Sequence, residues 1–316
     1  MTGTTMKAVR IHEYGGPEVL RYEDAPVPAI AEDEVLIEVR CAAVNPVDYK
    51  IREGRLSEKL RYRLPLILGW DVAGVVVETG TAANGFRVGD RVYSRPDIAR
   101  DGAYAEYLAV KAHDCARKPE RMAFAAAAGV PLAALTAWKA LFDEGGLKSG
   151  QTVLVHGASG GVGSFAVQIA KAFHCQVIAV TSTPNVEMVK TLGADRVVDY
   201  RKQDFASSVR DVDVVLDTLG GETQSKSWRV LREGGTLVSI VSAPDEAAGA
   251  ERRARGRYAW VVPDGARLQL LAGMIDAGKL RTVIDTVLPL SQAAAAHERS
   301  ASGRARGKII LAVKSD

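Results

Sequence analysis

Apolar positions in the first 121 residues come in short runs that are typical of β-strands, such as residues 35–40 and 72–77. Glycine and proline interrupt these runs at short intervals, which indicates frequent turns. A polar turn at residues 45–48 leads into a short helix. This pattern predicts a compact β-barrel or sandwich at the start of the chain.

The pattern changes near residue 122. Ala- and Leu-rich helical segments come first, broken at residues 129–131, and strands then alternate with helices. The expected strands are residues 153–155, 177–180, 196–198, 212–216 and 236–240. This alternation predicts a parallel, doubly wound α/β sheet. After residue 264 we expect a helix at 268–275, a turn at 288–290, a helix at 292–299 and a last strand at 308–313.

A glycine-rich turn follows the first of these strands. Gly157, Gly160, Gly161 and Gly163 separate the strand from a helix that is expected to begin near Val162. Residues without Cβ let the backbone turn sharply and let a pyrophosphate approach the main chain. The unpaired N–H groups and the positive end of the helix then meet the phosphates. Strand, glycine turn, helix and strand together predict a dinucleotide site, whereas glycines in a plain turn are the simpler alternative.

The end of the second strand bears on the choice of cofactor. Units that bind NAD place an Asp or Glu about 20 residues after the turn, but this chain has Thr181, Ser182 and Thr183 there and no carboxylate before Glu187. Hydroxyls without negative charge leave room for a 2′-phosphate, so NADP(H) is favoured. The alternative is that these hydroxyls only cap the helix expected near Pro184.

Composition restricts the class of protein. The 316 residues suffice for two domains, and 47% hydrophobic and 25% charged residues are ordinary for a globular protein. A net charge of +3 does not suggest nucleic-acid binding, and we expect the basic residues 252–257 to be a solvated loop. No apolar run reaches the length of a membrane span. Three scattered cysteines and a strand that begins at residue 6 lead us to expect a cytoplasmic protein without a signal peptide.

Eight segments together resemble the medium-chain dehydrogenase/reductase superfamily, and within it the zinc-free quinone oxidoreductases of the ζ-crystallin type. They are residues 41–48, 66–74, 86–92, 102–107, 127–138, 156–163, 192–200 and 307–311. The resemblance implies a GroES-like, partly open β-barrel catalytic domain formed by residues 1–121 and 263–316. It also implies a Rossmann dinucleotide-binding domain at residues 122–262.

Departures from the zinc-dependent branch exclude a catalytic metal in this interpretation. That branch has a Cys and a His-Glu pair at positions where this chain has Asn45, Trp70 and Asp71. Tryptophan does not ligate zinc and an amide is a poor ligand for it. The segment for a structural zinc lobe is short and lacks cysteine. Without a Lewis acid the substrate must accept hydride readily, as quinones and α,β-unsaturated carbonyls do.

The resemblance also implies the site. Asn45 and Thr136 are expected near the nicotinamide, residues 160–163 under the pyrophosphate, and Ser182 and Tyr200 near the adenosine phosphate. The full set of expected cofactor residues is Asn45, Thr136, Ser159, Gly160, Gly161, Val162, Gly163, Thr181, Ser182, Tyr200, Leu219 and Gly220. In relatives a Lys grips the 2′-phosphate where this chain has Asn185 or Val186.

Three residues are candidates for the chemistry: Asn45, Asp48 and Tyr49. Asp48 either lies in the active site or only caps the short helix that follows. The proton donor is Tyr49, Lys50 or solvent, since both residue types serve as general acids. We expect residues 243–258 to form a loop. One alternative is that this loop, with Trp260 beyond it, covers the substrate. The other, which we favour, is that Trp260 lies in the core.

Two other functions stay open. One is an enoyl-thioester reductase on the same scaffold, for which the basic residues 252–257 are the one hint. The other is an NADPH-binding structural or sensing protein without turnover. In each case the partner is a small molecule rather than nucleic acid or membrane, and we expect a homodimer.

Overall fold

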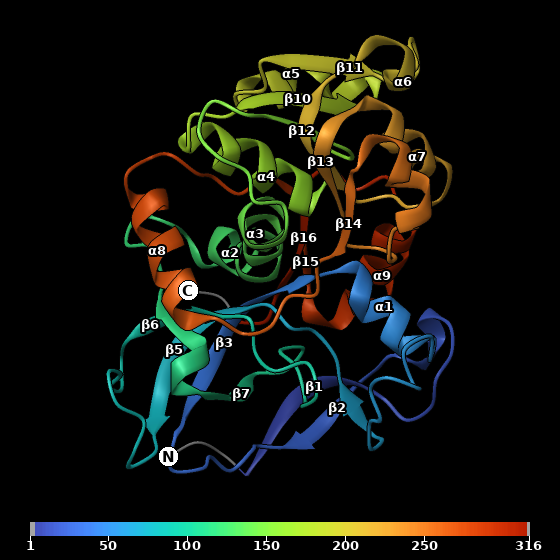
Figure 1. Ribbon diagram of the computed structural model, residues 1–316. Coiled ribbons are helices and arrows are strands. Elements are labelled where there is room, and N and C mark those ends of the chain that lie inside the picture. Colours follow the sequence, from blue (N-terminus) through green and yellow to red (C-terminus); the bar gives the residue numbers. More distant parts are fainter. Residues whose placement is uncertain (1–3, 315–316) are drawn as a thin grey trace. The chain divides into compact units, whose positions relative to one another are not determined.

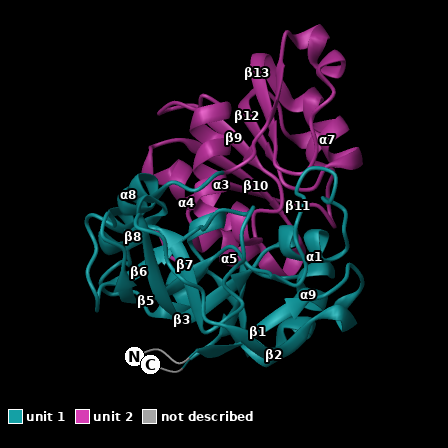
Figure 2. Cartoon of the chain, turned by 90° about the horizontal axis from the view of Figure 1, so that it is seen from below, with its two compact units in different colours: residues 1–132, 262–278, 282–316 teal, residues 133–261, 279–281 magenta. Residues whose placement is uncertain are grey.

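The computed structural model describes residues 4–314, which form two compact units (Figures 1 and 2). Unit 1 comprises residues 1–132, 262–278 and 282–316, and unit 2 comprises residues 133–261 and 279–281. Helix α2 (Phe124–Ala128) belongs to unit 1, whereas the expected nucleotide-binding domain begins at residue 122. The domain bounds expected from the sequence stay a prediction.

Unit 2 is built on a six-stranded sheet in the order β11-β10-β9-β12-β13-β14, and every neighbouring pair is parallel. The strands are β9 (Thr152–Val155), β10 (Gln176–Thr181), β11 (Arg196–Asp199), β12 (Val212–Asp217), β13 (Leu231–Ser239) and β14 (Arg255–Tyr258). Its helices are α3 (Pro131–Trp138), which begins in unit 1, and α4 (Gly161–Ala172), α5 (Val186–Thr191), α6 (Phe205–Ser208) and α7 (Gly221–Ser227). The predicted parallel α/β sheet is confirmed.

The buried strands explain this architecture. β9 and β12 are the central strands, and their apolar side chains are almost completely buried. Such continuous β-branched and aliphatic runs are typical of parallel strands that helices cover on both faces. The core on one face includes Leu154, Val180, Val215 and Trp228. The carboxyl ends of β9, β10 and β12 therefore share one edge of the sheet, where the turn residues gather.

Unit 1 is organised around the 11-residue strand β3 (Glu34–Val44). Along one edge β3 pairs with β5 (Val72–Thr79); it also pairs with β7 (Tyr107–Lys111) near its start and with β16 (Lys308–Ala312) near its end. The remaining strands are β1 (Thr5–Ile11), β2 (Arg21–Pro26), β4 (Leu66–Ile67), β6 (Arg91–Ser94), β8 (Cys115–Arg117) and β15 (Ile284–Pro289). β1, β2 and β4 form a separate three-stranded sheet.

The helices of unit 1 are α1 (Pro46–Arg52), α2, α8 (Gly265–Asp276) and α9 (Ala293–Ala301). Helix α1 starts where β3 ends, so residue 45 joins a buried strand to a helix. Helix α9 packs against α1 and precedes β16. Segments from the start and the end of the chain therefore build one unit, as the resemblance implied (Figure 2).

Three local expectations were wrong. Leu288 and Pro289 lie in strand β15 rather than in a turn, since proline is tolerated at the end of an edge strand. Residues 243–258 are not only a loop, because they contain a 3₁₀ segment (Glu246–Arg252) and the edge strand β14. Trp260 is 39% exposed and is not a core residue. The basic side chains of Arg252, Arg253, Arg255 and Arg257 are exposed, as expected.

Candidate functional site

The glycine turn of unit 2 lies between β9 and α4. Gly157 has a φ of +58°, and a Cβ on Gly163 would lie 2.3 Å from the Gly157 carbonyl oxygen. Only glycine lets the turn and the first turn of the helix approach this closely. Gly160 is the N-cap of α4 and supplies no side chain to cap it. The first N–H groups of a 12-residue helix are thus left without a side-chain acceptor.

This turn fits a pyrophosphate. A Cβ built on Gly160 would meet only the Gly157 carbonyl oxygen, at 3.3 Å, so the main chain there is approachable. The helix N-terminus adds partial positive charge to its free N–H donors. The turn is also held to the end of β10, since the Asn185 side chain donates to Ser159 Oγ at 3.1 Å. Residues 159–163 therefore form a cradle of the kind that binds phosphates.

The ends of β10 and β11 bring the expected adenosine-side residues together. Thr181 pairs with Asp199 across the sheet, and its carbonyl oxygen accepts a bond from the Tyr200 amide at 3.1 Å. Thr181 Oγ1 is buried and has no hydrogen-bond partner among the described residues. Ser182 Oγ accepts a bond from Asn185 at 3.2 Å. No side-chain capping hydrogen bond is made to the segments Thr183–Asn185 and Val186–Thr191, so the capping alternative is not realised there.

An open hollow of about 520 Å³ lies beside these residues. It is lined by Thr183, Val186, Glu187, Val197, Asp199, Lys202 and Gln203. The Asp199 carboxylate is already occupied by the Thr183 hydroxyl at 2.7 Å and the Arg201 amide at 3.1 Å. Lys202 is exposed and lies 3.9 Å from Asp199, too far for a strong bond. Lys202 and the exposed Arg201 are therefore cations at this end of the sheet.

The end of β12 is held by a buried carboxylate. Asp217 Oδ1 accepts bonds from the amides of Leu219 (3.0 Å) and Gly220 (2.9 Å), and its Oδ2 from Gln224 and Ser239. Gly220 adopts a φ of +74°, which an L side chain rarely adopts. Leu219 is consequently displayed at the surface of unit 2, 56% exposed. Thr136, the remaining cofactor candidate, is buried on α3.

In unit 1, three buried polar side chains form a closed cluster. Asn45 Nδ2 donates to Asp71 Oδ2 at 2.8 Å, and Lys308 Nζ donates to the same oxygen at 3.0 Å. Lys308 Nζ also donates to Asn45 Oδ1. The other Asp71 oxygen accepts the Leu132 amide at 2.6 Å. Asn45 is thus held at both ends of its amide, by residues from the start of β5 and from β16.

Asp48 closes the N-terminus of α1. Its Oδ2 accepts a hydrogen bond from the backbone N–H of Asn45 at 2.8 Å, and Asn45 and Asp48 form a reciprocal capping box. Oδ2 also accepts the Tyr104 hydroxyl at 2.7 Å, while Oδ1 has no partner among the described residues. Burial raises the Asp48 pKa to about 7, although its hydrogen bonds and the Lys308 charge oppose the shift. The capping alternative is thus realised, and this carboxyl group is fully buried.

The chain of hydrogen bonds continues through His297. The single Tyr104 hydroxyl proton goes to Asp48, so His297 Nε2 donates to the Tyr104 oxygen at 3.2 Å. Nδ1 of His297 then accepts from Arg52 at 3.3 Å. Burial and the Arg52 charge lower the His297 pKa to about 3, so this ring is neutral. Asp48, Tyr104, His297 and Arg52 are all buried.

The positions where zinc-dependent relatives hold their metal do not fit zinc in this chain. Asn45 and Asp71 already bind the Lys308 ammonium, which is itself a cation. The Trp70 ring N–H donates to the Arg100 carbonyl at 3.2 Å and has no lone pair for a metal. Within residues 4–314 no group of three or more His, Cys, Asp or Glu side chains has a metal-binding arrangement.

Tyr49, Lys50 and His156 are further titratable side chains of the two units. Tyr49 and Lys50 are half-buried on α1, and burial lowers the Lys50 pKa. His156 follows β9 and lies 2.9 Å from Ser227 Oγ through its Nε2. Burial lowers the His156 pKa to about 4. His156 is thus completely buried and hydrogen-bonded.

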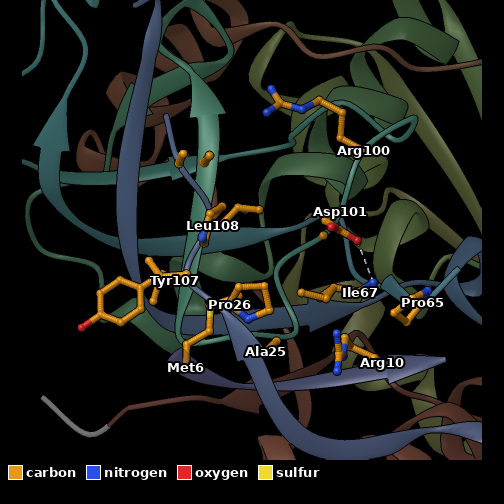
Figure 3. A pocket seen from close by; sticks show the side chains of 15 residues that line it. Met6, Arg10, Ala25, Pro26, Pro65, Ile67, Arg100, Asp101, Tyr107 and Leu108 are labelled. Carbon is orange, nitrogen blue, oxygen red and sulfur yellow. Dashed lines mark hydrogen bonds between the residues drawn. The ribbon is translucent and has the colours of Figure 1, made fainter. Parts of the chain in front are cut away.

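A separate hollow of about 390 Å³ lies in unit 1 (Figure 3). Arg10, Pro26, Pro65, Arg100 and Tyr107 are among its lining residues, and none of the predicted site residues is. Both arginines are paired, Arg10 with Glu23 at 2.7 Å and Arg100 with Glu34. Asp101 accepts the Ile67 amide at 2.9 Å. The charged side chains Arg10, Arg100 and Asp101 that line this hollow already have partners, so the hollow does not form a candidate site.

A parallel six-stranded sheet with a phosphate cradle after its first strand defines a nucleotide-binding α/β protein. The comparisons with known proteins narrow this class. Residues 31–120 match the model of the alcohol dehydrogenase GroES-like domain, and residues 192–311 match that of the zinc-binding dehydrogenases.

Relatives of known name cover nearly the whole chain. The 2-methylene-furan-3-one reductase of Solanum lycopersicum is 39% identical over 97% of this chain and 79% of its own length. The NADPH-dependent alkenal/one oxidoreductase of Arabidopsis thaliana is 37% identical with the same coverage. The solved structure of the quinone oxidoreductase from Coxiella burnetii is 33% identical, covers 98% of this chain and all of its own, and has a TM-score of 0.92.

The chain belongs to the medium-chain dehydrogenase/reductase superfamily, in its quinone oxidoreductase branch. It is an oxidoreductase that uses a nicotinamide cofactor and a small-molecule substrate. The expected Rossmann and GroES-like architecture is confirmed. Within residues 4–314 no helix has the length and apolar character to cross a membrane.

Sequence reasoning missed part of the polar core of unit 1. Lys308 was noticed only within the closing motif, and Tyr104 only within a matching segment. The five histidines are scattered in the sequence, so nothing in it groups His297 with Asp48 or Tyr104. A charged residue at the start of an otherwise apolar last strand was the one available signal for Lys308. His297 had no signal, since its partners lie 193 and 245 residues away.

Proposed function

We propose that the protein is an NADPH-dependent, zinc-independent reductase that transfers hydride to a quinone or an activated α,β-unsaturated carbonyl. The observation that carries this proposal is the cluster of Asn45, Asp71 and Lys308. At the positions of the metal ligands this cluster has an amide and a carboxylate, and the Lys308 ammonium binds to both of them. A substrate reduced without a Lewis acid must itself stabilise the charge that hydride brings.

The residues of unit 2 support NADPH. Ser182 and Asn185 present a hydroxyl and an amide at the end of β10, where NAD-binding units have a carboxylate. Lys202 supplies a positive charge on the rim of the neighbouring hollow. The alkenal/one oxidoreductase that is 37% identical is named as NADPH-dependent. Residues 159–163 hold the pyrophosphate in this proposal.

A bound nicotinamide would supply a hydride, that is, a proton with two electrons. In an enone the hydride adds to the β-carbon, the C=C π electrons move to the carbonyl oxygen, and the α-carbon then takes a proton. In a quinone the same two electrons and two protons give the hydroquinone. The protein orients its substrate, excludes water and stabilises the developing negative charge.

Asn45, Asp48 and Tyr49 are assigned different tasks. Asn45 is held rigidly at the end of β3 and lines the reacting end of the site. Asp48 fixes the Asn45 backbone from within the core. Tyr49 is the proposed proton donor, since it is half-buried on the same helix; Lys50 and solvent are the other sources.

A homodimer in the cytoplasm completes the proposal. Strand β14 is an edge strand of unit 2 and offers unpaired backbone groups. Light scattering tests the dimer, and a monomer at micromolar concentration contradicts it.

The test is oxidation of NADPH with 9,10-phenanthrenequinone and with an alkyl vinyl ketone, with NADH in parallel and with chelator. NADPH-preferring turnover that chelator leaves unchanged is the expected result. Preference for a crotonyl thioester over both acceptors would replace the proposal with an enoyl-thioester reductase. Tight NADPH binding without any turnover would make the protein a binding module.

A further inference from the structure

The ion pair between Asp71 and Lys308 in unit 1 is almost completely buried. The two side chains are 0% and 3% exposed, and their charged atoms lie 3.0 Å apart. Their neighbours along the chain, Val72 and Ile309, belong to the hydrophobic core of unit 1. Desolvating two charges is costly, and apolar side chains of equal volume often stabilise a core as well or better. Stability alone therefore gives no reason for these charges.

The geometry of the pair resembles that of a bound cation. Lys308 Nζ has two oxygen partners, Asn45 Oδ1 and Asp71 Oδ2. Positions 45 and 71 are those at which zinc-dependent relatives carry metal ligands. The ammonium thus lies between the two side chains that would face a metal.

We propose that the Lys308 ammonium takes the place of a metal between Asn45 and Asp71, and that it acts on hydride transfer as a positioning residue through Asn45. This inference rests on the proposed function. Lys308 binds the oxygen of the Asn45 amide and Asp71 binds its nitrogen, so the amide has one orientation and is polarised. An amide dipole held in one orientation in a low-dielectric site stabilises developing negative charge without having to reorganise.

Lys308→Met tests this role, because methionine keeps most of the side-chain volume and loses the charge. The matched control is Lys314→Met, which removes an ammonium just beyond the same strand, where it pairs with Glu38 and is half-exposed. We expect kcat to fall about 100-fold in Lys308→Met, with less than threefold change in the Kd of NADPH. Lys314→Met should leave both values unchanged. An unchanged kcat, or a loss confined to the Kd of NADPH, would overturn the inference.

A double variant distinguishes a role of the Asp71–Lys308 pair in catalysis from a purely structural role. Lys308→Met and Asp71→Asn each leave one buried charge without its partner, so both should lower Tm. The double variant Asp71→Asn/Lys308→Met removes both charges, and Tm should recover. We expect kcat to stay low in the double variant. Recovery of kcat together with Tm would show that the pair only maintains the fold.

A readout independent of turnover distinguishes failure of the inference from failure of the proposed function. In protein labelled with ¹⁵N-lysine, the Lys308 ammonium should give an NMR signal protected from solvent exchange, absent in Lys308→Met and unchanged by excess Zn²⁺. Displacement of this signal by Zn²⁺ would refute the inference. A protected signal in a protein that reduces no acceptor would refute the proposed function, and the inference with it, since the inference rests on that function.

Discussion

The Tyr104 hydroxyl donates a 2.7 Å hydrogen bond to the Asp48 carboxylate in a part of unit 1 where both side chains are completely buried. The second Asp48 oxygen has no partner among the described residues. The carboxylate therefore keeps less solvation than it has in water, and its pKa rises to about 7. Asp48 thus exchanges its proton near neutral pH.

Replacing Asp48 with asparagine should change how stability depends on pH. The folded pKa is raised from 3.8 to about 7, so the folded state binds this proton more tightly than the unfolded state. Between these pH values the Asp48 contribution to stability falls as pH rises, by at most about 1.4 kcal/mol per pH unit. The stability of Asp48→Asn relative to the wild type should therefore rise from pH 5 to pH 7. Urea unfolding at each pH measures it.

The quantity to follow is the difference in stability between Asp48→Asn and the wild type, because the contribution of His297 to stability changes with pH in the opposite direction. Its folded pKa of about 3 lies below the ordinary 6.5, so its contribution is present above pH 6.5 and is lost as pH falls. This term is common to both proteins and cancels. A difference that does not change with pH would contradict the raised pKa of Asp48.

Tyr104→Phe should destabilise unit 1 by about 1–3 kcal/mol. It removes one of the two donors to Asp48 Oδ2 and leaves His297 Nε2 without an acceptor, both inside the core. Tyr62→Phe is the matched control, since that half-buried hydroxyl only donates to the Ile98 carbonyl. Denaturant unfolding of both variants should give the larger loss for Tyr104. Equal losses would mean that the chain through His297 adds nothing.

Gly163→Ala should weaken cofactor binding at least tenfold. The new Cβ would lie 2.3 Å from the Gly157 carbonyl oxygen, so the turn and the start of α4 must separate. Gly273→Ala is the control, because that helical glycine has no atom within 4 Å of an added Cβ. Alanine there should raise stability by about 0.5–1 kcal/mol and leave binding alone. Fluorescence titration with NADPH distinguishes the two. Unchanged affinity in Gly163→Ala would show that the phosphates bind elsewhere.

Asn185→Asp should reduce the affinity for NADPH about tenfold and that for NADH much less. Aspartate has the same shape, and where the Asn185 amide nitrogen donates to Ser159 Oγ and Ser182 Oγ, a carboxylate oxygen would instead accept from these two hydroxyls, so the local contacts survive with their direction reversed. Its negative charge repels a 2′-phosphate. Asn84→Asp, on an exposed loop of unit 1, controls for the change in net charge. Equal losses for NADPH and NADH would remove the argument for a phosphate at the end of β10.

The sequence predicted best where structure is local. Strand β9, the glycine turn and α4 follow one another within 21 residues, so periodicity and glycine spacing specify them. Predictions failed where distant packing decides. Trp260 looks like a core residue by composition, yet it lies just beyond the edge strand β14 and is 39% exposed. Exposure at a sheet edge depends on which strand is last, and this is not a local property.

The same difference between local structure and distant packing explains which site residues could be predicted from the sequence. Asn45 was identifiable because a polar turn precedes a helix at a position that matches a known family. Its partners were not, because no pattern within a window of residues links Asn45 to Lys308. Buried polar clusters form between strands that neighbour each other only in the folded chain, so the spacing in sequence carries no information on them.

The distance in sequence between Asn45 and Lys308 has a consequence for synthesis. The two side chains that bind each other are 263 residues apart, and β16 pairs directly with β3. Every strand of unit 2 lies between them in the sequence, so on the ribosome unit 2 is made in full when β5 and β7 are available to pair with β3 but β16 is not. Unit 2 therefore assembles first and unit 1 is completed last. A nascent chain gains the ability to hold a nucleotide well before it can act on a substrate, and a stop before residue 308 would leave a binder that is catalytically silent.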